Sequence, residues 1–285
     1  MQKRVISVHD ISCVGRCSLT VALPIISAAG VECSVIPTAL LSTHTGGFTG
    51  YTFLPLTGEM EKITAHLKTL NRPADAVYTG YLGSPEQIGA AKVIIADLMR
   101  EGGIAVVDPV MGDGGRLYSG FDCRMVEGMR ELCAAASVII PNITETSFLL
   151  GRPCPENPPV PGAETEALLR DLCGLGPSAA VLTGVYSSDG GIGAAYYDSV
   201  TGCLGYAFSE KYEGFYHGTG DVFGSAFTSA IVLGASISEA SEEAVAFTGA
   251  VVRRTKDSPE DKRYGPVFEP ELGSFAGRMS RLHYR

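Results

Sequence analysis

The chain of 285 residues contains no tryptophan, no block of consecutive lysines and arginines, and no long apolar run. Its formal net charge is −9 and its isoelectric point is about 5.1, so nucleic acids and anionic membrane surfaces are not expected partners. No apolar run approaches the roughly 20 residues that span a bilayer. The first residues, Met1–Arg4, lead directly into a short strand-like run instead of an export signal. These absences predict a cytoplasmic protein.

Several common motifs are absent as well. No Gly-Lys dipeptide occurs, which excludes a Walker A phosphate loop. A glycine-rich turn near the C-terminal end has the spacing Gly-x-Gly-x-x-x-Gly, so it is not the dinucleotide fingerprint. The eight cysteines form no Cys-x-x-Cys pair, and none pairs with a histidine at zinc spacing. We therefore expect small, buried, reduced thiols, with Cys13 and Cys17 in a loop of the site.

The residues that are present predict an α/β fold. The composition, 45% hydrophobic and 19% charged, is typical of a globular protein with a sizeable core. Short apolar strands alternate with amphipathic helices, which indicates a parallel sheet covered by helices on both faces. The β-runs Gly191–Tyr197 and Gly202–Phe208 predict an antiparallel hairpin. The segment Lys256–Phe268 is expected to be irregular, and residues 1–285 are expected to form one domain.

The expected strands are Arg4–Val8, Glu32–Ile36, Ala76–Thr79, Ile104–Asp108, Ser137–Ile140 and Ala179–Thr183. The expected helices are Leu19–Ala29, Glu59–Leu70, Pro85–Arg100, Cys123–Ala135, Thr144–Leu150, Ala163–Leu172, Val222–Leu233 and Ser238–Thr255. In such sheets, ligands bind beyond the carboxyl ends of the strands. This rule selects the loops His9–Cys17, Pro37–Tyr51, Gly80–Ser84, Asp108–Ser119, Pro141–Glu145, Thr183–Asp189 and Ser209–Asp221 as the candidate site.

The run Phe215–Asp221 carries the strongest single indication of chemistry. Gly218 and Gly220 flank Thr219 directly before an apolar helical stretch. This arrangement lets several backbone N–H groups point at one place, where the helix dipole also favours negative charge. An anion hole of this kind suits a phosphate and Asp221 suits a general base, which suggests phosphoryl transfer to a hydroxyl. Taken alone, the same residues also fit an ordinary turn followed by a first-turn helical acid.

Two acids, Asp108 and Asp113, follow a buried strand in a glycine-rich loop. Asp108 at the strand end is placed to hold a magnesium-bound water, since Mg²⁺ prefers few carboxylates together with waters and phosphates. Asp113 in the flexible loop is placed to meet the γ-phosphate region and to close over it. An Asp-Pro turn followed by glycines explains the same residues equally well.

The next two strand ends carry Asn142, Glu145 and Thr183. Glu145 would be the second acid on the metal, but Asn142 and Glu145 also fit a helix N-cap with its capping-box partner. Thr183 offers a hydroxyl to a nucleotide pocket, or is simply a strand-end threonine. Tyr81, between two glycines, is placed to stack on a flat ring. The alternative for Tyr81 is a tyrosine at the edge of the core.

Taken together, these loops resemble the ribokinase-like superfamily, and within it the pyridoxal kinase family, over roughly Val5–Val252. Gly-Thr-Gly-Asp without a preceding Asp-Thr is similar to the vitamin kinases. The combination of Ser-x-His-Thr-Gly and Gly-Tyr-Leu-Gly resembles pyridoxal kinase more than hydroxymethylpyrimidine kinase. The matching motifs are Ser42-x-His44-Thr45-Gly46, Gly80-Tyr81-Leu82-Gly83, Asp108-Pro109-Val110-Met111-Gly112-Asp113, Pro141-Asn142-x-x-Glu145 and Gly218-Thr219-Gly220-Asp221.

The resemblance implies a ribokinase-like three-layer α/β/α sandwich with a mostly parallel sheet and an antiparallel edge hairpin. It implies ATP-dependent phosphorylation of the 5′-hydroxymethyl group of pyridoxal, pyridoxine or pyridoxamine. It also implies ATP as phosphoryl donor and Mg²⁺ as cofactor, is compatible with a K⁺ requirement, and implies a homodimer.

The resemblance also assigns residues by position. Asp221 is similar to the base that takes the proton of the substrate hydroxyl, and Gly218, Thr219 and Gly220 are similar to the anion hole. The substrate positions are Asp10, Thr45, Tyr81 and Asp221. The ATP positions are Asp108, Asp113, Asn142, Glu145, Thr183 and Lys211, and the metal positions are Asp108 and Glu145, acting through water.

Two positions depart from the family pattern. Asp10 stands where the family usually has a serine that meets the ring, and a carboxylate there favours a protonated pyridinium. Asp10 also resembles an Asp of hydroxymethylpyrimidine kinases, and Ile140 replaces a threonine near the nucleotide. One alternative is therefore a hydroxymethylpyrimidine kinase of the same fold. Another is a non-catalytic protein that binds a vitamer or nucleotide, although every expected catalytic position holds a competent residue.

Overall fold

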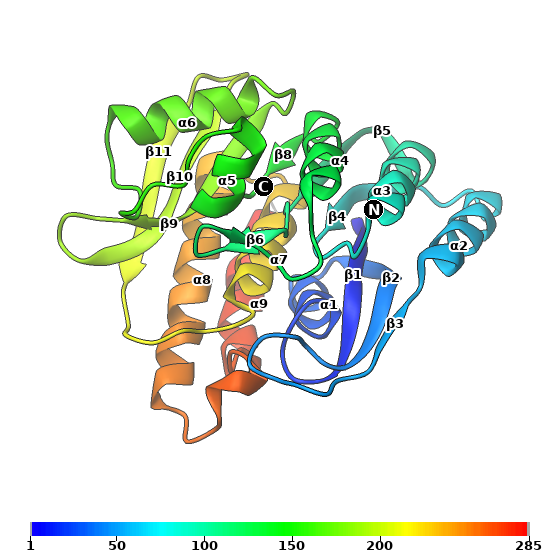
Figure 1. The fold of residues 1–285 in the computed structure, drawn as a ribbon, viewed down its shortest axis with the longest axis horizontal. Coiled ribbons are helices and arrows are strands. Elements are labelled where there is room, and N and C mark those ends of the chain that lie inside the picture. The colour runs from blue at the N-terminus through cyan, green and yellow to red at the C-terminus, as the bar shows by residue number, and fades with distance from the viewer. Residues whose placement is uncertain (1, 284–285) are drawn as a thin grey trace.

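The computed structural model describes residues 2–283, which contain a nine-stranded sheet with the order β11-β10-β9-β8-β5-β4-β1-β2-β3 (Figure 1). A separate two-stranded ribbon pairs β6 (Gly112–Asp113) with β7 (Arg116–Leu117). The strands of the large sheet are β1 Arg4–Val14, β2 Glu32–Thr43, β3 Phe53–Pro55, β4 Ala74–Thr79, β5 Met99–Val107, β8 Val138–Ile139, β9 Ala179–Tyr186, β10 Gly191–Asp198 and β11 Leu204–Glu210.

The centre of the large sheet is parallel and its edges are antiparallel. The strands from β2 through β1, β4, β5 and β8 to β9 pair in parallel. The pairs β9–β10, β10–β11 and β2–β3 are antiparallel. The mostly parallel sheet and the edge hairpin that the sequence predicts are therefore confirmed.

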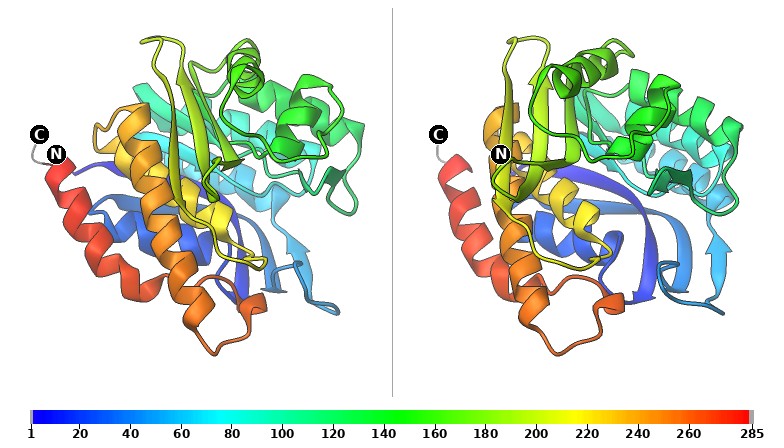
Figure 2. Two further views of the ribbon diagram at one scale, coloured as in Figure 1. Left: turned by 90° about the vertical axis from the view of Figure 1, so that its left-hand side faces the viewer. Right: turned by 60° about the vertical axis from the view of Figure 1, so that its left-hand side comes forward.

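Helices cover both faces of this sheet, which confirms the three-layer architecture (Figure 2). Val5 of β1 packs in the core under α1, α7, α8 and α9, whereas the next residue, Ile6, packs in the core under α2 to α6. Such strands are apolar on both faces because neither face meets water. The helices are α1 Leu19–Ala28, α2 Thr57–Thr69, α3 Pro85–Leu98, α4 Cys123–Ala134, α5 Ile143–Leu150, α6 Ala163–Cys173, α7 Thr219–Val232, α8 Ile237–Asp257 and α9 Leu272–His283.

Two central strands run further than the sequence predicts. We expected loops to begin at His9 and at Pro37, but β1 and β2 remain paired as far as Val14 and Thr43. The pairing of β1 with β4 already stops at Val8, so the ends of β1 and β2, together with β3, extend beyond their neighbours (Figure 1). The extension was not predicted because the strands were recognised by apolar runs, and the ends of these strands contain polar residues such as Asp10 and Ser12.

Other boundaries also differ from the prediction. Helix α3 ends at Leu98, and Met99 and Arg100 begin β5 instead of closing the helix. The strands β3, β6 and β7 and the helix α9 were not predicted. The segment Lys256–Phe268 is largely irregular as expected, apart from the end of α8 and a 3-10 turn, η1 (Lys262–Tyr264). Between residues 2 and 283, no helix combines the length and the apolar character that a membrane crossing requires.

The cysteine prediction is partly wrong. All eight cysteines are free thiols, but Cys13, Cys123 and Cys203 are exposed, and Cys133 is the fully buried one. Cysteine was expected inside because it behaves as a small apolar residue. Cys13 lies near the end of β1, beyond the part of that strand that β4 covers.

Candidate active site

The first turn of α7 has the backbone geometry of an anion site. Gly218 precedes the helix with φ of 84°, and a Cβ atom there would lie 2.5 Å from the carbonyl oxygen of Arg16. Only glycine suits that position, since a side chain would be both strained and blocked. The first amides of a helix have no intrahelical acceptor and carry the positive end of the dipole. Gly220 leaves the space beside its Cα open, so Gly218, Thr219 and Gly220 present free backbone where the sequence predicts an anion hole.

Asp221 lies in the same turn and is held by the segment that precedes α1. Its Oδ2 atom accepts a hydrogen bond from the Ser18 backbone N–H at 2.9 Å and one from the Cys17 thiol at 3.5 Å. Between residues 2 and 283, Oδ1 has no protein donor and is therefore available as a proton acceptor. Burial raises the pKa of Asp221, and the bonds from Ser18 and Cys17 oppose that shift.

Three carboxyl groups, Asp108, Glu145 and Asp221, share one region and are called the acid cluster below. Asp108 follows β5, and its N–H donates to the Thr79 carbonyl at 3.0 Å. Burial raises the pKa of Asp108 well above its usual range, and the charges of Glu145 and Asp221 raise it further. Between residues 2 and 283, no ion pair involves any member of the acid cluster. Burial therefore disfavours the ionised forms of these acids, and a bound cation would stabilise them.

Glu145 belongs both to this cluster and to a helix cap. Its carboxylate accepts the Asn142 N–H at 2.9 Å and the Met111 N–H at 3.2 Å. The Asn142 side-chain oxygen accepts the Glu145 N–H at 2.9 Å, so the capping box is confirmed. Burial nevertheless raises the pKa of Glu145, and the backbone bonds oppose the shift. Capping and metal binding are compatible here, because the cap fixes the Glu145 carboxylate in a place where its charge still raises the pKa of Asp108.

The glycine-rich ribbon of β6 and β7 carries Asp113 near Glu145 of the acid cluster. Asp113 on β6 is exposed, and its charge contributes to the raised pKa of Glu145. The ribbon is fixed to the start of α5, since the Asn142 amide donates to the Gly112 carbonyl at 3.0 Å. The Gly115 N–H donates to the Thr144 hydroxyl at 2.9 Å. The structure thus brings Asp113 and Asn142 to the same side of the acid cluster.

Two predicted nucleotide residues lie further along the sheet edge. The Thr183 N–H donates to the Pro141 carbonyl at 3.0 Å, so Thr183 lies next to Asn142. Lys211 is exposed, with its Nζ atom 4.6 Å from the centre of the Tyr186 ring. No contact joins Lys211 to the acid cluster in the described part of the chain.

On the other side of Asp221 lie the residues predicted for the substrate ring. Asp10 on β1 is 5% exposed and accepts a hydrogen bond from the Ser18 hydroxyl at 2.5 Å. Burial, together with the charge of Asp221, raises the pKa of Asp10 to about 6 against the opposing bond from Ser18. The Tyr81 ring stacks on Phe121 with a centroid distance of 5.8 Å. Burial raises the pKa of Tyr81 to about 12, and Asp10 contributes to the rise.

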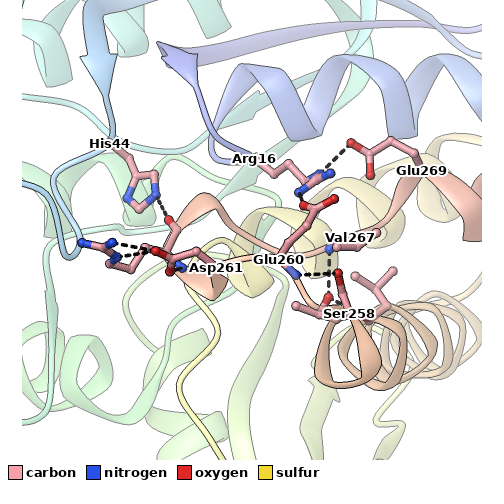
Figure 3. Close-up of polar contacts among 10 residues, drawn as sticks. Arg16, His44, Ser258, Glu260, Asp261, Val267 and Glu269 are labelled. Atoms are coloured by element: carbon pink, nitrogen blue, oxygen red, sulfur yellow. Dashed lines mark hydrogen bonds and ion pairs between the residues drawn. The ribbon is translucent and has the colours of Figure 1, made fainter.

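Thr45 lies in a loop that closes onto the residue before the anion hole. Thr45 itself is exposed and has no hydrogen-bond partner among residues 2–283. Its neighbour Gly46 packs so closely that a Cβ atom there would lie 2.6 Å from the His217 ring. The Gly46 N–H donates to Nδ1 of His44 at 3.2 Å, so Nε2 carries the proton and donates to the Arg263 carbonyl at 2.6 Å (Figure 3). This loop and Thr45 are thereby held at the site.

Residues 258–269, which largely coincide with the segment Lys256–Phe268 that was expected only to be irregular, hold two loops of the site. Besides His44, they bind Arg16, whose guanidinium pairs with Glu260 at 2.9 Å and with Glu269 at 2.7 Å (Figure 3). The Arg16 N–H also donates to the Tyr264 carbonyl at 2.8 Å. Arg16 and Ser18 were missed from the sequence, since no local pattern reveals that Arg16 pairs with Glu260 and Glu269, or that Ser18 binds Asp221.

Comparison with known proteins agrees with this geometry. Residues 22–267 match the family model described as phosphomethylpyrimidine kinase. A solved Bacteroides thetaiotaomicron protein, provisionally named a phosphomethylpyrimidine kinase, is 38% identical, with 96% of this chain and 93% of that chain covered and a TM-score of 0.90. An orthorhombic form under the same name, with pyridoxal, is 36% identical over 98% of this chain and 96% of that chain, with a TM-score of 0.87.

Two further relatives carry the name pyridoxal kinase. The structure of pyridoxal kinase from Lactobacillus plantarum is 29% identical, covers 99% of both chains and has a TM-score of 0.88. A Caenorhabditis elegans protein provisionally named a pyridoxal kinase is 29% identical over 264 residues, which is 80% of this chain and 78% of that protein.

Proposed function

We propose the reaction of this chain from the premise that it belongs to the phosphomethylpyrimidine kinase family. The chain transfers the γ-phosphoryl group of ATP to the 5′-hydroxymethyl group of a vitamin B6 vitamer. Relatives named pyridoxal kinase, and a similar structure that holds pyridoxal, support a pyridine substrate. The observation that carries the proposal is Asp221, which has a free carboxylate oxygen beside the anion site of α7 and lies between Asp10 and Asp108.

The two sides of Asp221 suit the two substrates. Asp10 is suited to pair with the protonated ring nitrogen of a pyridine, and Tyr81 to contact the ring. Asp221 takes the proton of the substrate hydroxyl through its Oδ1 atom while the new bond to phosphorus forms. The amides of Gly218, Thr219 and Gly220 stabilise the charge that develops on the transferred group.

The acid cluster fits a divalent cation. Between residues 2 and 283, no group of three or more His, Cys, Asp or Glu side chains is placed to enclose a metal ion. Mg²⁺ suits the site, since it needs few carboxylates and fills its shell with water and phosphate oxygens. Asp108 and Glu145 would hold it through water, and the bound ion would neutralise phosphate charge.

We assign the nucleotide to the strand ends beside the acid cluster. Asn142 and Thr183 would contact it there, and Lys211 would contact it further from the cluster. Asp113, on its glycine-rich ribbon, excludes water from the transferring phosphoryl group. A K⁺ requirement, a homodimer, a cytoplasmic location and a single kinase domain over residues 1–285 complete the proposal. The K⁺ requirement and the homodimer rest on the family resemblance, whereas the cytoplasmic location and the single domain rest on the sequence; residues 1 and 284–285 lie outside the described part of the chain.

A hydroxymethylpyrimidine substrate is the second candidate. The description of the family model and the name of the relative with 38% identity favour it. The carboxylate at Asp10, where pyridoxal kinases usually have serine, favours it too. Against it stand the relatives named pyridoxal kinase and the similar structure with pyridoxal.

The test of the proposal is an assay of ADP release from Mg-ATP. The candidate substrates are pyridoxal, pyridoxine, pyridoxamine and hydroxymethylpyrimidine, each measured beside a control without substrate. Turnover that depends on a pyridine supports the proposal and identifies the preferred vitamer. Turnover with the pyrimidine alone shows the second candidate to be correct. Binding of pyridoxal without any ADP release would contradict both kinase assignments and indicate a non-catalytic vitamer-binding protein.

A further inference from the structure

We infer that Ser18 is a positioning residue that fixes the catalytic base and the ring-binding carboxylate relative to each other. This inference rests on the proposed function. The Ser18 backbone N–H binds Asp221 at 2.9 Å, and the Ser18 hydroxyl binds Asp10 at 2.5 Å. Ser18 is 4% exposed. One buried residue therefore connects the two carboxylates on which proton transfer and ring binding depend.

The backbone of Ser18 has a conformation that side chains rarely adopt. Its φ is 55° and its ψ is −127°, a combination that is almost confined to glycine. Strain of this kind persists only where the surroundings impose it. Here the Ser18 carbonyl accepts the amides of Val21 and Ala22 at 3.0 and 2.9 Å, and Ile11 forms a bridge to Ser18. Both flanks of the residue are fixed.

Glycine would adopt this backbone without strain, but it would remove the hydroxyl. The serine at this place is also the N-cap of α1, yet its side chain makes no capping bond. Its hydroxyl binds Asp10 instead. The side chain therefore serves the site and not the helix, and it is retained at the expense of backbone strain.

The hydroxyl also affects the charge of Asp10. Asp10 faces Asp221 from α7, Tyr81 from the end of β4 and Cys17 from the turn before α1. The Ser18 hydroxyl is the side-chain donor that lowers the pKa of Asp10, and the Asp10 backbone N–H lowers it as well. Loss of the hydroxyl therefore leaves Asp10 protonated to a higher pH and weakens its pairing with a pyridinium nitrogen.

Comparison of Ser18→Gly with Ser18→Ala in the full chain tests this role. Both variants lose the hydroxyl, but only the glycine variant also loses the strain. We expect both to lower kcat/KM for pyridoxal about tenfold or more, the effect of losing one hydrogen bond to a charged group. The KM for ATP stays constant. The acid limb of the pH profile of kcat/KM moves to higher pH in both variants.

The thermal midpoints separate strain from function. We expect Ser18→Gly to unfold roughly 2–4 °C above Ser18→Ala, because glycine relieves the backbone strain. Ser236→Ala is the matched control, since Ser236 is an N-cap serine of α8 that does cap its helix. It should lower the thermal midpoint and leave kcat/KM and its pH profile unchanged.

If the wild-type chain is active, three outcomes would overturn the inference. The first is wild-type kinetics and pH profile in both variants. The second is a loss in Ser18→Ala that Ser18→Gly restores, which would assign the effect to the backbone. The third is an equal kinetic loss in Ser236→Ala. If the wild-type chain has no turnover, the proposed function is what fails. Calorimetric titration with pyridoxal then tests whether Ser18 positions Asp10 for ring binding. Equal Kd values for pyridoxal in the wild-type protein and both variants would contradict the role of Ser18.

Discussion

The ligand-free protein should lose stability as the pH rises above about 4, because Asp10, Asp108 and Glu145 are buried and form no ion pair within residues 2–283. Asp10 allows the magnitude to be worked out. Burial raises its pKa to about 6, whereas the ordinary value, which applies to the unfolded chain, is 3.8. Below pH 3.8 both states are protonated, so the folded state keeps its full advantage. Between these values the folded state holds a proton that the unfolded state has released.

Each pH unit in this interval therefore lowers the free energy of unfolding by about 1.4 kcal/mol. Over the whole interval Asp10 alone costs about 3 kcal/mol, a sizeable part of the stability of an ordinary domain. The pKa values of Asp108 and Glu145 are also raised by burial, so the decline continues at higher pH.

Urea denaturation at pH values from 4 to 7, without nucleotide or metal, measures this dependence. Asp10→Ser removes the titrating group, and its stability should fall less steeply between pH 4 and 6 by about 1.4 kcal/mol per unit. Glu61→Gln, which removes an exposed carboxylate on α2, should retain the wild-type slope. The reasoning is refuted if Asp10→Ser and the wild-type protein have the same pH dependence, or if wild-type stability rises between pH 4 and 6.

Three further predictions concern the site. Asp221→Asn should lower kcat for vitamer phosphorylation by about 10²–10⁴-fold with the KM for ATP unchanged, and steady-state kinetics showing a near-normal rate would contradict its role as base. Gly218→Ala should lower both kcat and the thermal midpoint, since its Cβ would lie 2.5 Å from the Arg16 carbonyl oxygen; wild-type values for both would show that the turn is not fixed. Asp108→Asn should raise the thermal midpoint of the free protein, because it removes a carboxyl whose ionisation is favoured only in the unfolded chain, and should increase the Mg²⁺ concentration needed for half-maximal turnover. An unchanged Mg²⁺ titration of that variant, with EDTA-treated wild-type protein as the inactive reference, would remove Asp108 from the metal site.

The fold was largely predictable because its signals are local. Short apolar runs such as Val5–Val8 indicate the buried strands. The helical spacing of apolar residues in the segments between those runs indicates the helices. The extension of β1 to Val14 escaped prediction, since Asp10 and Ser12 interrupt the apolar pattern. Both residues are buried even so: Ser12 pairs with Leu41 of β2, and Asp10 accepts a hydrogen bond from Ser18 in the turn before α1. Tertiary contacts, not residue type, decide such a strand end.

The acid cluster was predictable in part because parallel strands end at the same edge of a sheet. That rule brings Asp108, Glu145 and Asp221 together without knowledge of any contact. It says nothing of Ser18, whose importance depends on an unusual φ and on two carboxylates from other elements. Nor does it reveal Arg16, whose partners Glu260 and Glu269 come from the far end of the chain.

The most direct test of the central claim is the fate of the γ-phosphoryl group in a quenched reaction of Mg-[γ-³²P]ATP with pyridoxal. The account predicts that the label appears on the 5′-oxygen of pyridoxal in the wild-type protein, and that Asp221→Asn transfers almost none while still binding ATP. Label found only in inorganic phosphate, or equal transfer to pyridoxal by Asp221→Asn, would contradict it.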